Sequence, residues 1–254
     1  MLLAIDAGNT QTVFGLHDGS EWRAVWRWAT DPSATEDQLA AVYFGLCRES
    51  GLEPKPRQAI CANVVPALSE SLRLFGTRWL GVQMISLSVE LLPGLKVVYD
   101  PPSAVGADRL ANALAVHALY SVPAIVVDFG TATTFDAIGP KGEYLGGVIL
   151  PGVEISMEAL FQRAARLPKV EVKAPPSVIG TDTVGSLQSG LVYGYAGAVD
   201  AIVRRMKPEL GGTAQAIATG GLASLYAPHC EEIAEVAPRL TLDGLRLAAE
   251  RLRI

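Results

Sequence analysis

The chain has 254 residues, of which 50% are hydrophobic and 19% are charged, a composition typical of globular proteins. This length is enough for one large domain or for two domains of ordinary size. The net charge is −5 at pH 7 and no lysine- or arginine-rich run occurs, which argues against a nucleic-acid partner held through its phosphates. An anionic ligand would have to be bound by local groups.

The first half of the chain is predicted to begin with three strands, at residues 2–5, 13–16 and 21–28, where apolar residues run together or alternate. Thr35 and Gln38 have the spacing of a capping box, and they predict a helix that ends at Gly51. Further strands are expected at 59–64, 82–87 and 96–99. Helices are expected from Pro66 and from about residue 108 to 119.

The second half is predicted to repeat this order. Strands are expected at 124–127, at 135–138 and within "GEYLGGVILPG" (142–152), followed by a helix at 151–165. A loop at 168–180 precedes a long helix through Met206, on which Val192, Tyr193 and Val199 could face either a core or a second chain. A strand at 214–218, a helix, a strand at 233–236 and a helix at 242–252 complete this half.

A polar turn also occurs twice, as "DAGNTQT" at 6–12 and as "DFGTATT" at 128–134, each directly after an apolar strand. Alignment of the two turns pairs Asp6 with Asp128 and Thr12 with Thr134. The offset is half a chain rather than a short repeat. We therefore expect two related α/β domains that face each other across a cleft, the first at residues 1–120 and the second at 121–254.

The first turn has the groups of a phosphate site. Gly8 would let a ligand approach the backbone closely, and successive turn amides can enclose an anion. The side chains of Asn9, Thr10 and Thr12 would add donors. Asp6 would repel an anion unless a cation, usually Mg²⁺, lies between them, as in a nucleoside triphosphate site. A single copy could be an ordinary hairpin turn, but two copies favour the site.

Other common sites lack their motifs. The chain has no G-x-x-x-x-G-K-[ST] loop and no G-x-G-x-x-G after its first strand, which argues against P-loop and dinucleotide-binding folds. It also has no H-E-x-x-H and no G-x-S-x-G, so zinc and serine hydrolases have no support.

The segment "AVGADRLANAL" (104–114) places Asp108 and Arg109 at a predicted helix start. Asp108 could simply complement the helix dipole, and Arg109 could be a surface residue. In a phosphoryl-transfer site, Asp108 could instead accept the proton of an attacking hydroxyl, and Arg109 could hold an anionic group. The glycines of "GGVILPG" (146–152) and "TGG" (219–221) are weaker signals. Gly220 and Gly221 could accept a flat adenine ring.

The cysteines Cys47, Cys61 and Cys230 have no metal-ligand spacing, which is typical of reduced thiols in a cytoplasmic protein. The opening apolar run stops at Asp6 with no basic segment before it, so no signal peptide is expected. The most apolar long segment, 113–127, is too short and too interrupted to span a bilayer.

Taken together and in this order, "DAGNTQT", "GADR", "DFGTATT", "GGVILPG" and "TGG" resemble type III pantothenate kinase. The resemblance covers essentially the whole chain. It implies an α/β fold of two duplicated ribonuclease-H-like (actin-like ATPase) domains with mixed sheets and a central cleft. It also implies ATP-dependent phosphorylation of pantothenate at its primary hydroxyl, the first step of coenzyme A biosynthesis, by a cytoplasmic homodimer.

Carried over by position, the resemblance implies a role for each motif residue. Asp108 would be the catalytic base, Asp6 would hold Mg²⁺ through water, and Asp128 would bind a monovalent cation, K⁺ or ammonium. ATP would contact Asp6, Ala7, Gly8, Asn9, Thr10, Gln11, Thr12, Val13, Thr131, Gly220 and Gly221. Pantothenate would contact Tyr99, Gly106, Ala107, Asp108, Arg109 and Thr183, the last across a dimer interface.

Two alternatives stay open at the level of the sequence. The generic phosphate turns would also suit a related kinase with the same fold that acts on another small acceptor, or a phosphatase-like hydrolase. The fold could also belong to a non-catalytic regulatory relative, because fold alone does not determine function. Intact Asp6, Asp108 and Asp128 argue against the second alternative.

Overall fold

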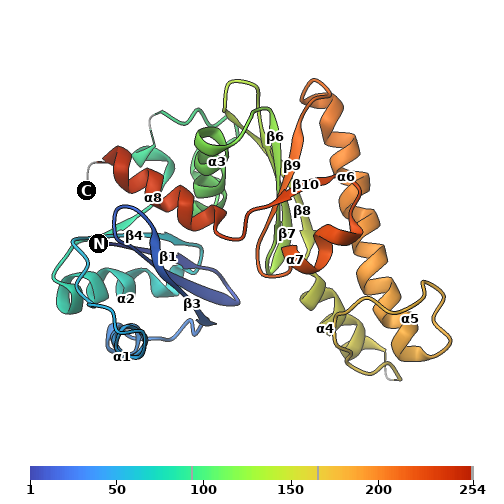
Figure 1. Cartoon of the computed structure of the whole chain (residues 1–254), viewed down its shortest axis with the longest axis horizontal. Coiled ribbons are helices and arrows are strands. Elements are labelled where there is room, and N and C mark those ends of the chain that lie inside the picture. The colour runs from blue at the N-terminus through green and yellow to red at the C-terminus, as the bar shows by residue number, and fades with distance from the viewer. Residues whose placement is uncertain (93, 165, 253–254) are drawn as a thin grey trace. The chain divides into compact units, whose positions relative to one another are not determined.

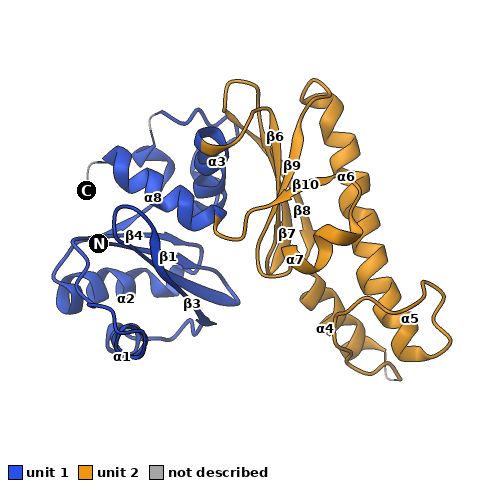
Figure 2. Cartoon of the chain, viewed as in Figure 1, with its two compact units in different colours: residues 1–118, 240–254 blue, residues 119–239 orange. Residues whose placement is uncertain are grey.

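The computed structural model describes residues 1–92, 94–164 and 166–252, and the chain divides into two compact units (Figures 1 and 2). Unit 1 contains residues 1–118 and the chain from Leu240 onward, and unit 2 contains residues 119–239. The first boundary is close to the expected one. The assignment of the last segment to the second domain needs correction, because the helix α8 (Leu240–Leu252) packs on strands of unit 1.

Unit 1 is built on a five-stranded mixed sheet with the order β3–β2–β1–β4–β5. β1, β2 and β3 pair antiparallel, whereas β1, β4 and β5 pair parallel. The strands are β1 (Leu2–Ala7), β2 (Gln11–His17), β3 (Trp22–Ala29), β4 (Gln58–Asn63) and β5 (Met84–Ser86). The strand predicted at 96–99 is wrong, since that segment makes only an isolated bridge at Val97.

Helices α1 (Glu36–Glu49) and α2 (Ser69–Leu74) cover one face of this sheet. Leu3 and Ile5 of β1 share a buried core with Leu39 and Tyr43 of α1 and with Leu72 of α2. The predicted capping box of α1 is confirmed. The short helices of unit 1 are η1 (Pro66–Leu68), the π-helical η2 (Phe75–Leu80), η3 (Val89–Leu91) and η4 (Pro102–Ala104).

The other face of the sheet lies against α8, which packs on β1 and β4 and also on α3 (Ala107–Leu119). A Cβ on Gly244 would lie 2.0 Å from the carbonyl oxygen of Ala111, so the two helices meet backbone to backbone. Successive strand residues point to opposite faces. Asp6 therefore shares the α8 face with Leu2 and Ala4.

Unit 2 repeats the sheet of unit 1, with the order β8–β7–β6–β9–β10 and the same pattern of antiparallel and parallel pairs. The strands are β6 (Ala124–Phe129), β7 (Ala132–Ile138), β8 (Tyr144–Pro151), β9 (Gln215–Thr219) and β10 (Ile233–Val236). The predicted duplication is thus present at the level of sheet topology.

The helices of unit 2 pack against one face of its sheet (Figure 1). The predicted long helix is confirmed, but a π-helical turn interrupts it. Its residues Val192 and Val199 are buried. The helices are α4 (Val153–Arg163), α5 (Thr183–Ser189), η5 (Gly190–Gly194), α6 (Tyr195–Glu209), α7 (Ala223–Tyr226) and η6 (Ala227–His229).

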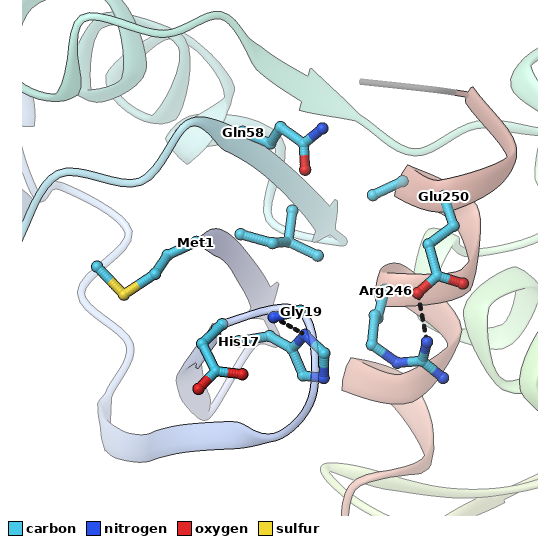
Figure 3. A pocket seen from close by; sticks show the side chains of 9 residues that line it. Met1, His17, Gly19, Gln58, Arg246 and Glu250 are labelled. Atoms are coloured by element: carbon cyan, nitrogen blue, oxygen red, sulfur yellow. Dashed lines mark hydrogen bonds and ion pairs between the residues drawn. The ribbon is translucent and has the colours of Figure 1, made fainter.

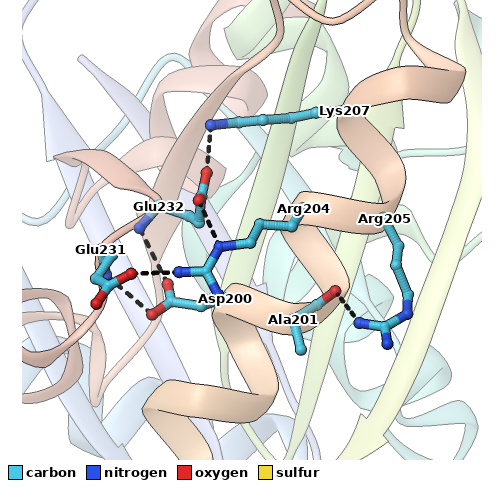
Figure 4. A network of polar contacts seen from close by, with 7 residues as sticks. All are labelled: Asp200, Ala201, Arg204, Arg205, Lys207, Glu231 and Glu232. Atoms are coloured by element: carbon cyan, nitrogen blue, oxygen red, sulfur yellow. Dashed lines mark hydrogen bonds and ion pairs between the residues drawn. The ribbon is translucent and has the colours of Figure 1, made fainter.

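A polar network fastens the segment before β10 to α6 (Figure 4). Asp200 is 5% exposed, and its two carboxylate oxygens accept hydrogen bonds of 3.0 Å from the backbone N–H groups of Glu231 and Glu232. Arg204 pairs with both glutamates at the surface, and Lys207 lies 2.5 Å from Glu232. The buried carboxylate therefore sets the path by which the chain enters β10.

No helix among residues 1–92, 94–164 and 166–252 combines the length and the apolar character needed to cross a membrane.

Candidate functional site

In unit 1 the predicted phosphate turn connects the carboxyl end of β1 to β2. The Gly8 N–H donates a hydrogen bond of 3.1 Å to the carbonyl oxygen of Gln11, which closes the turn. Asn9, Thr10 and Gln11 are exposed, Asp6, Gly8 and Val13 are half-buried, and Ala7 and Thr12 are buried. The tip of the turn is thus open to a ligand, while its base is part of the sheet.

Thr30, the residue after β3, holds this turn through three hydrogen bonds. Its hydroxyl donates to the Gly8 carbonyl oxygen at 2.6 Å, and its N–H donates to the Thr10 carbonyl oxygen at 2.9 Å. Its hydroxyl oxygen also lies 2.8 Å from that of Thr12. Thr30 was missed at the sequence level, where the only signal was a hydroxyl residue at the end of the third strand.

The start of α3 lies at the same edge of the sheet as this turn. The N–H of Val64, which follows β4, donates to the Ala7 carbonyl oxygen at 3.1 Å. A Cβ on Gly106 would lie 3.5 Å from the Val64 side chain and 2.5 Å from the Asp108 carboxylate oxygen Oδ1. The structure therefore brings Gly106, Ala107, Asp108 and Arg109 to the carboxyl ends of β1 and β4.

Asp108 lies in an environment that suits a proton acceptor. Burial raises the pKa of its carboxyl above the ordinary value of 3.8, while a hydrogen bond from the Arg109 N–H and the charge of Arg109 act in the opposite direction. That N–H donates to Oδ1 at 2.8 Å. A base whose pKa is raised toward neutrality takes a proton more readily, provided that it is ionised before the reaction.

Unit 2 places an equivalent turn at the carboxyl end of β6, beside the end of β9. Asp128 is paired with Thr219, and the Gly130 N–H donates to the Ala132 carbonyl oxygen at 3.1 Å. Gly220 has a φ of +92°, and a Cβ there would lie 2.4 Å from an oxygen of Asp128. Glycine is needed at this position for both its dihedral angle and its lack of a side chain.

The alignment of Thr12 with Thr134 needs correction, because the second turn is one residue shorter. Thr12 pairs with Ala7 across the first hairpin, whereas Phe129, the counterpart of Ala7, pairs with Thr133. Thr133 therefore occupies the place of Thr12, and the two residues are 1% and 2% exposed. Within the described part of the chain, the Thr133 hydroxyl is buried with no hydrogen-bond partner.

Gly152 explains why Thr133 lacks the hydroxyl partner that Thr12 has. It follows β8 as Thr30 follows β3, and a Cβ there would lie 2.1 Å from the Thr131 carbonyl oxygen. A glycine packed on the turn has no hydroxyl to offer Thr133. The Gly152 backbone thus lies against the Thr131 carbonyl group in unit 2.

Two predicted pantothenate contacts lie outside these turns. Tyr99 is half-buried in the loop before η4. Thr183 is exposed at the first position of α5, a helix that lies away from the unit 2 sheet (Figure 1). It lines a surface hollow of about 510 Å³ together with Leu167, Gly180 and Ser186 among others.

A hollow of about 420 Å³ in unit 1 lies at the opposite end of β1, around Met1, His17 and Arg246 (Figure 3). The His17 Nδ1 accepts a 3.1 Å hydrogen bond from the Gly19 N–H, and Arg246 pairs with Glu250 at 2.5 Å. Because β1 starts here and ends at the phosphate turn, this hollow is not part of the predicted site.

The two turn carboxylates fit the cations that the resemblance implies. Asp6 and Asp128 each bring one carboxylate to a turn, and the absence of a side chain at Gly220 lets the Asp128 carboxylate lie close to the backbone after β9. Mg²⁺ in nucleotide sites is commonly held by one or two carboxylates together with water and phosphate oxygens. Among the residues that the structure describes, no cluster of three or more His, Cys, Asp or Glu side chains is positioned to hold a metal.

Comparison with known proteins identifies the family. A sequence model described as type III pantothenate kinase matches residues 2–205. The type III pantothenate kinases of Anaeromyxobacter sp. (strain Fw109-5) and Moorella thermoacetica are both 48% identical to this chain. The first alignment spans 254 residues and 100% of each chain, and the second spans 252 residues and 99% of each.

Among solved structures, the ROK hexokinase from Thermus thermophilus covers 97% of both chains with a TM-score of 0.51 and 15% sequence identity, which is a likeness in fold. The predicted α/β fold of two duplicated mixed sheets is confirmed. On the strength of the family match and the full-length relatives, the chain belongs to the type III pantothenate kinase family.

Proposed function

We propose that Asp108 is the catalytic base with which this chain phosphorylates pantothenate from ATP, the first step of coenzyme A biosynthesis. The observation that carries the proposal is the position of its carboxylate, at the start of α3 and at the same sheet edge as the Asp6 turn. Burial of this carboxyl group raises its pKa, which favours transfer of a proton to it.

In the proposed reaction, the primary hydroxyl of pantothenate gives its proton to the Asp108 carboxylate. The hydroxyl oxygen forms a bond to the γ-phosphorus of ATP, the bond to the β-phosphate oxygen breaks, and ADP leaves. The charge of Arg109 acts on Asp108, and this guanidinium would hold the carboxylate of pantothenate. Positioning and charge stabilisation supply most of the catalysis in reactions of this kind.

The turn at Gly8–Gln11, whose residues Asn9, Thr10 and Gln11 are exposed, would bind the phosphates through the N–H groups of Asn9 and Gln11 and through the side chains of Asn9 and Thr10. Asp6 would hold Mg²⁺ through water, and Asp128 would hold the monovalent cation. These cations would neutralise charge on the phosphates. The ATP contacts in unit 2, at Thr131, Gly220 and Gly221, and the pantothenate contacts at Tyr99 and Thr183 stay predictions.

The test is the Asp108→Asn variant in a coupled assay with pantothenate, ATP, Mg²⁺ and K⁺. We expect kcat to fall by roughly 100-fold or more while the Kd for ATP changes little, because general-base catalysis typically contributes 100- to 10,000-fold. Asp18→Asn, in the turn at the other end of the hairpin, is the matched control and keeps its activity. Near wild-type turnover by Asp108→Asn would show that Asp108 is not the base.

We also propose that the chain forms a homodimer through unit 2. Large apolar side chains are exposed on β8, on α4 and around the start of α5, including Ile149 (63%), Val178 (64%) and Ile179 (82%). Exposed apolar groups gathered in one unit indicate an interface. Thr183 lies in this region, which suits its predicted role across the dimer. Light scattering should give twice the chain mass, and Ile179→Asp should give the monomer.

A cytoplasmic location stays a prediction. The free thiols of Cys47, Cys61 and Cys230 agree with it, since reducing compartments keep cysteines unpaired.

A further inference from the structure

We propose that Thr30 is a positioning residue for nucleotide binding, which holds the Gly8–Gln11 turn in the shape that binds ATP phosphates. The inference rests on the proposed ATP-binding role of this turn. Thr30 lies outside the turn in sequence and reaches it only because β3 pairs with β2. It is half-buried.

The hydrogen atoms of this cluster can be assigned. A threonine hydroxyl has one hydrogen to donate. The Thr30 hydroxyl donates it to the Gly8 carbonyl oxygen at 2.6 Å. The 2.8 Å contact between the two hydroxyl oxygens must then use the hydrogen of Thr12, with Thr30 as the acceptor. Because the Gly8 carbonyl oxygen can only accept, it determines the direction of both hydrogen bonds.

This assignment changes the role of Thr12. The sequence predicts its hydroxyl as a donor toward phosphate, but in the structure its hydrogen is directed to Thr30. Its oxygen can still accept a hydrogen bond. Thr12 is 2% exposed, so its position is set by the sheet rather than by a ligand. The N–H groups of the turn, rather than this hydroxyl, would then be the donors that face the phosphates.

Thr30 holds the turn at three points along its length. It contacts the carbonyl oxygens of Gly8 and Thr10 and the hydroxyl of Thr12. Because the peptide bond is planar, a carbonyl oxygen that is held in place also fixes the direction of the N–H group of the following residue. Fixing the Gly8 and Thr10 carbonyls therefore orients the N–H groups of Asn9 and Gln11.

Unit 2 provides an internal comparison. At the place of Thr30 it has Gly152, which packs on the turn through its backbone, and the hydroxyl at the place of Thr12, that of Thr133, has no partner among the described residues. The hydroxyl cluster is thus specific to the turn of unit 1, where the phosphate loop is proposed, and is not a general requirement of the duplicated hairpin.

The experiment compares Thr30→Val, which removes the hydroxyl at nearly constant volume, with Thr30→Ser, which keeps it. The Kd for ATP with Mg²⁺ is measured by calorimetry on the full chain without acceptor, and the unfolding temperature is measured without ligand. We expect Thr30→Val to raise the Kd for ATP about tenfold, equal to 1.4 kcal/mol and within the range of one net hydrogen bond. Thr30→Ser should keep the Kd for ATP within about twofold of the wild-type value, well below the tenfold change expected of Thr30→Val.

Thr77→Val is the matched control, because the Thr77 hydroxyl bonds only backbone carbonyls of its own helical segment. It should bind ATP as the wild type does. In steady-state assays, Thr30→Val should raise the KM for ATP more than the KM for pantothenate. If Thr30→Val does not fold, Thr30→Ala removes the same hydroxyl without adding a methyl group.

A Thr30→Val protein with a lowered unfolding temperature but an unchanged Kd for ATP would overturn the inference and leave a structural role. This outcome differs from failure of the proposed function, in which the wild type binds ATP but does not phosphorylate pantothenate. In that case the ratio of the Kd values still decides the role of Thr30. A wild type that binds no ATP would overturn both.

Discussion

The unpartnered hydroxyl of Thr133 leads to a prediction in which a single change stabilises the protein. Thr133 is 1% exposed on β7, and no described residue accepts or donates a hydrogen bond at its hydroxyl. Burying a hydroxyl without a partner costs about 1–3 kcal/mol in protein mutational data. Thr133→Val keeps the shape and removes the hydroxyl, so we expect it to raise the free energy of unfolding by about 1 kcal/mol.

The same substitution at Thr219 should have the opposite effect. Thr219 is 2% exposed on β9 of the same unit, and its hydroxyl donates a 2.8 Å hydrogen bond to the carbonyl oxygen of Ala237. Thr219→Val would leave this buried carbonyl without that donor, which costs about 1–3 kcal/mol. Both changes convert a buried strand threonine to valine, so strand propensity and volume cancel between them.

The assay is thermal unfolding of both variants without ligand, since a change of 1 kcal/mol moves Tm by about 2–4 °C in a chain of this size. Thr133→Val should melt about 2–4 °C above the wild type, and Thr219→Val at least about 2–4 °C below it. A Tm for Thr133→Val that falls as far as that of Thr219→Val would refute the reasoning. It would show that the Thr133 hydroxyl has a partner in the folded protein.

Further outcomes follow from substitutions of single residues. Burial raises the pKa of Asp108 in the folded chain. The stability that its proton gives is therefore present below the ordinary pKa of 3.8 and is lost as the pH rises through the raised pKa. Asp108→Asn should accordingly raise Tm at pH 7 but not near pH 3. Gly220→Ala should lower both Tm and ATP affinity in melting and calorimetric titrations, because the new Cβ would lie 2.4 Å from the Asp128 carboxylate. Asp200→Ala removes the acceptor of two backbone N–H groups and should cost about 3 kcal/mol or more in chemical denaturation. Arg204→Ala, at the exposed rim of the same network, should cost at most about 1 kcal/mol.

The elements that could be predicted from the sequence are those with local signals. The strands around the two turns are apolar runs bounded by polar turn residues, and the first long helix has a capping box at Thr35 and Gln38. Asp108 could be proposed as a site residue for a similar reason, because a helix start is recognisable and an acid there has a small number of uses. Where the local signal is weak, as at residues 96–99, the predicted strand is wrong.

The features that could not be predicted depend on which residues meet across long distances in the chain. The packing of α8 on unit 1 is decided by close contact between Gly244 and Ala111, which periodicity in either helix does not show. The role of Thr30 depends on the register of β3 against β2, and the place of Thr133 depends on a turn one residue shorter. A motif aligned letter by letter assumes equal turn lengths, and that assumption placed Thr134 where Thr133 lies. Since side chains alternate between the faces of a strand, an error of one residue assigns the hydroxyl to the wrong face. The hydrogen-bond partners of the two turns therefore follow from strand pairing rather than from the repeated letters.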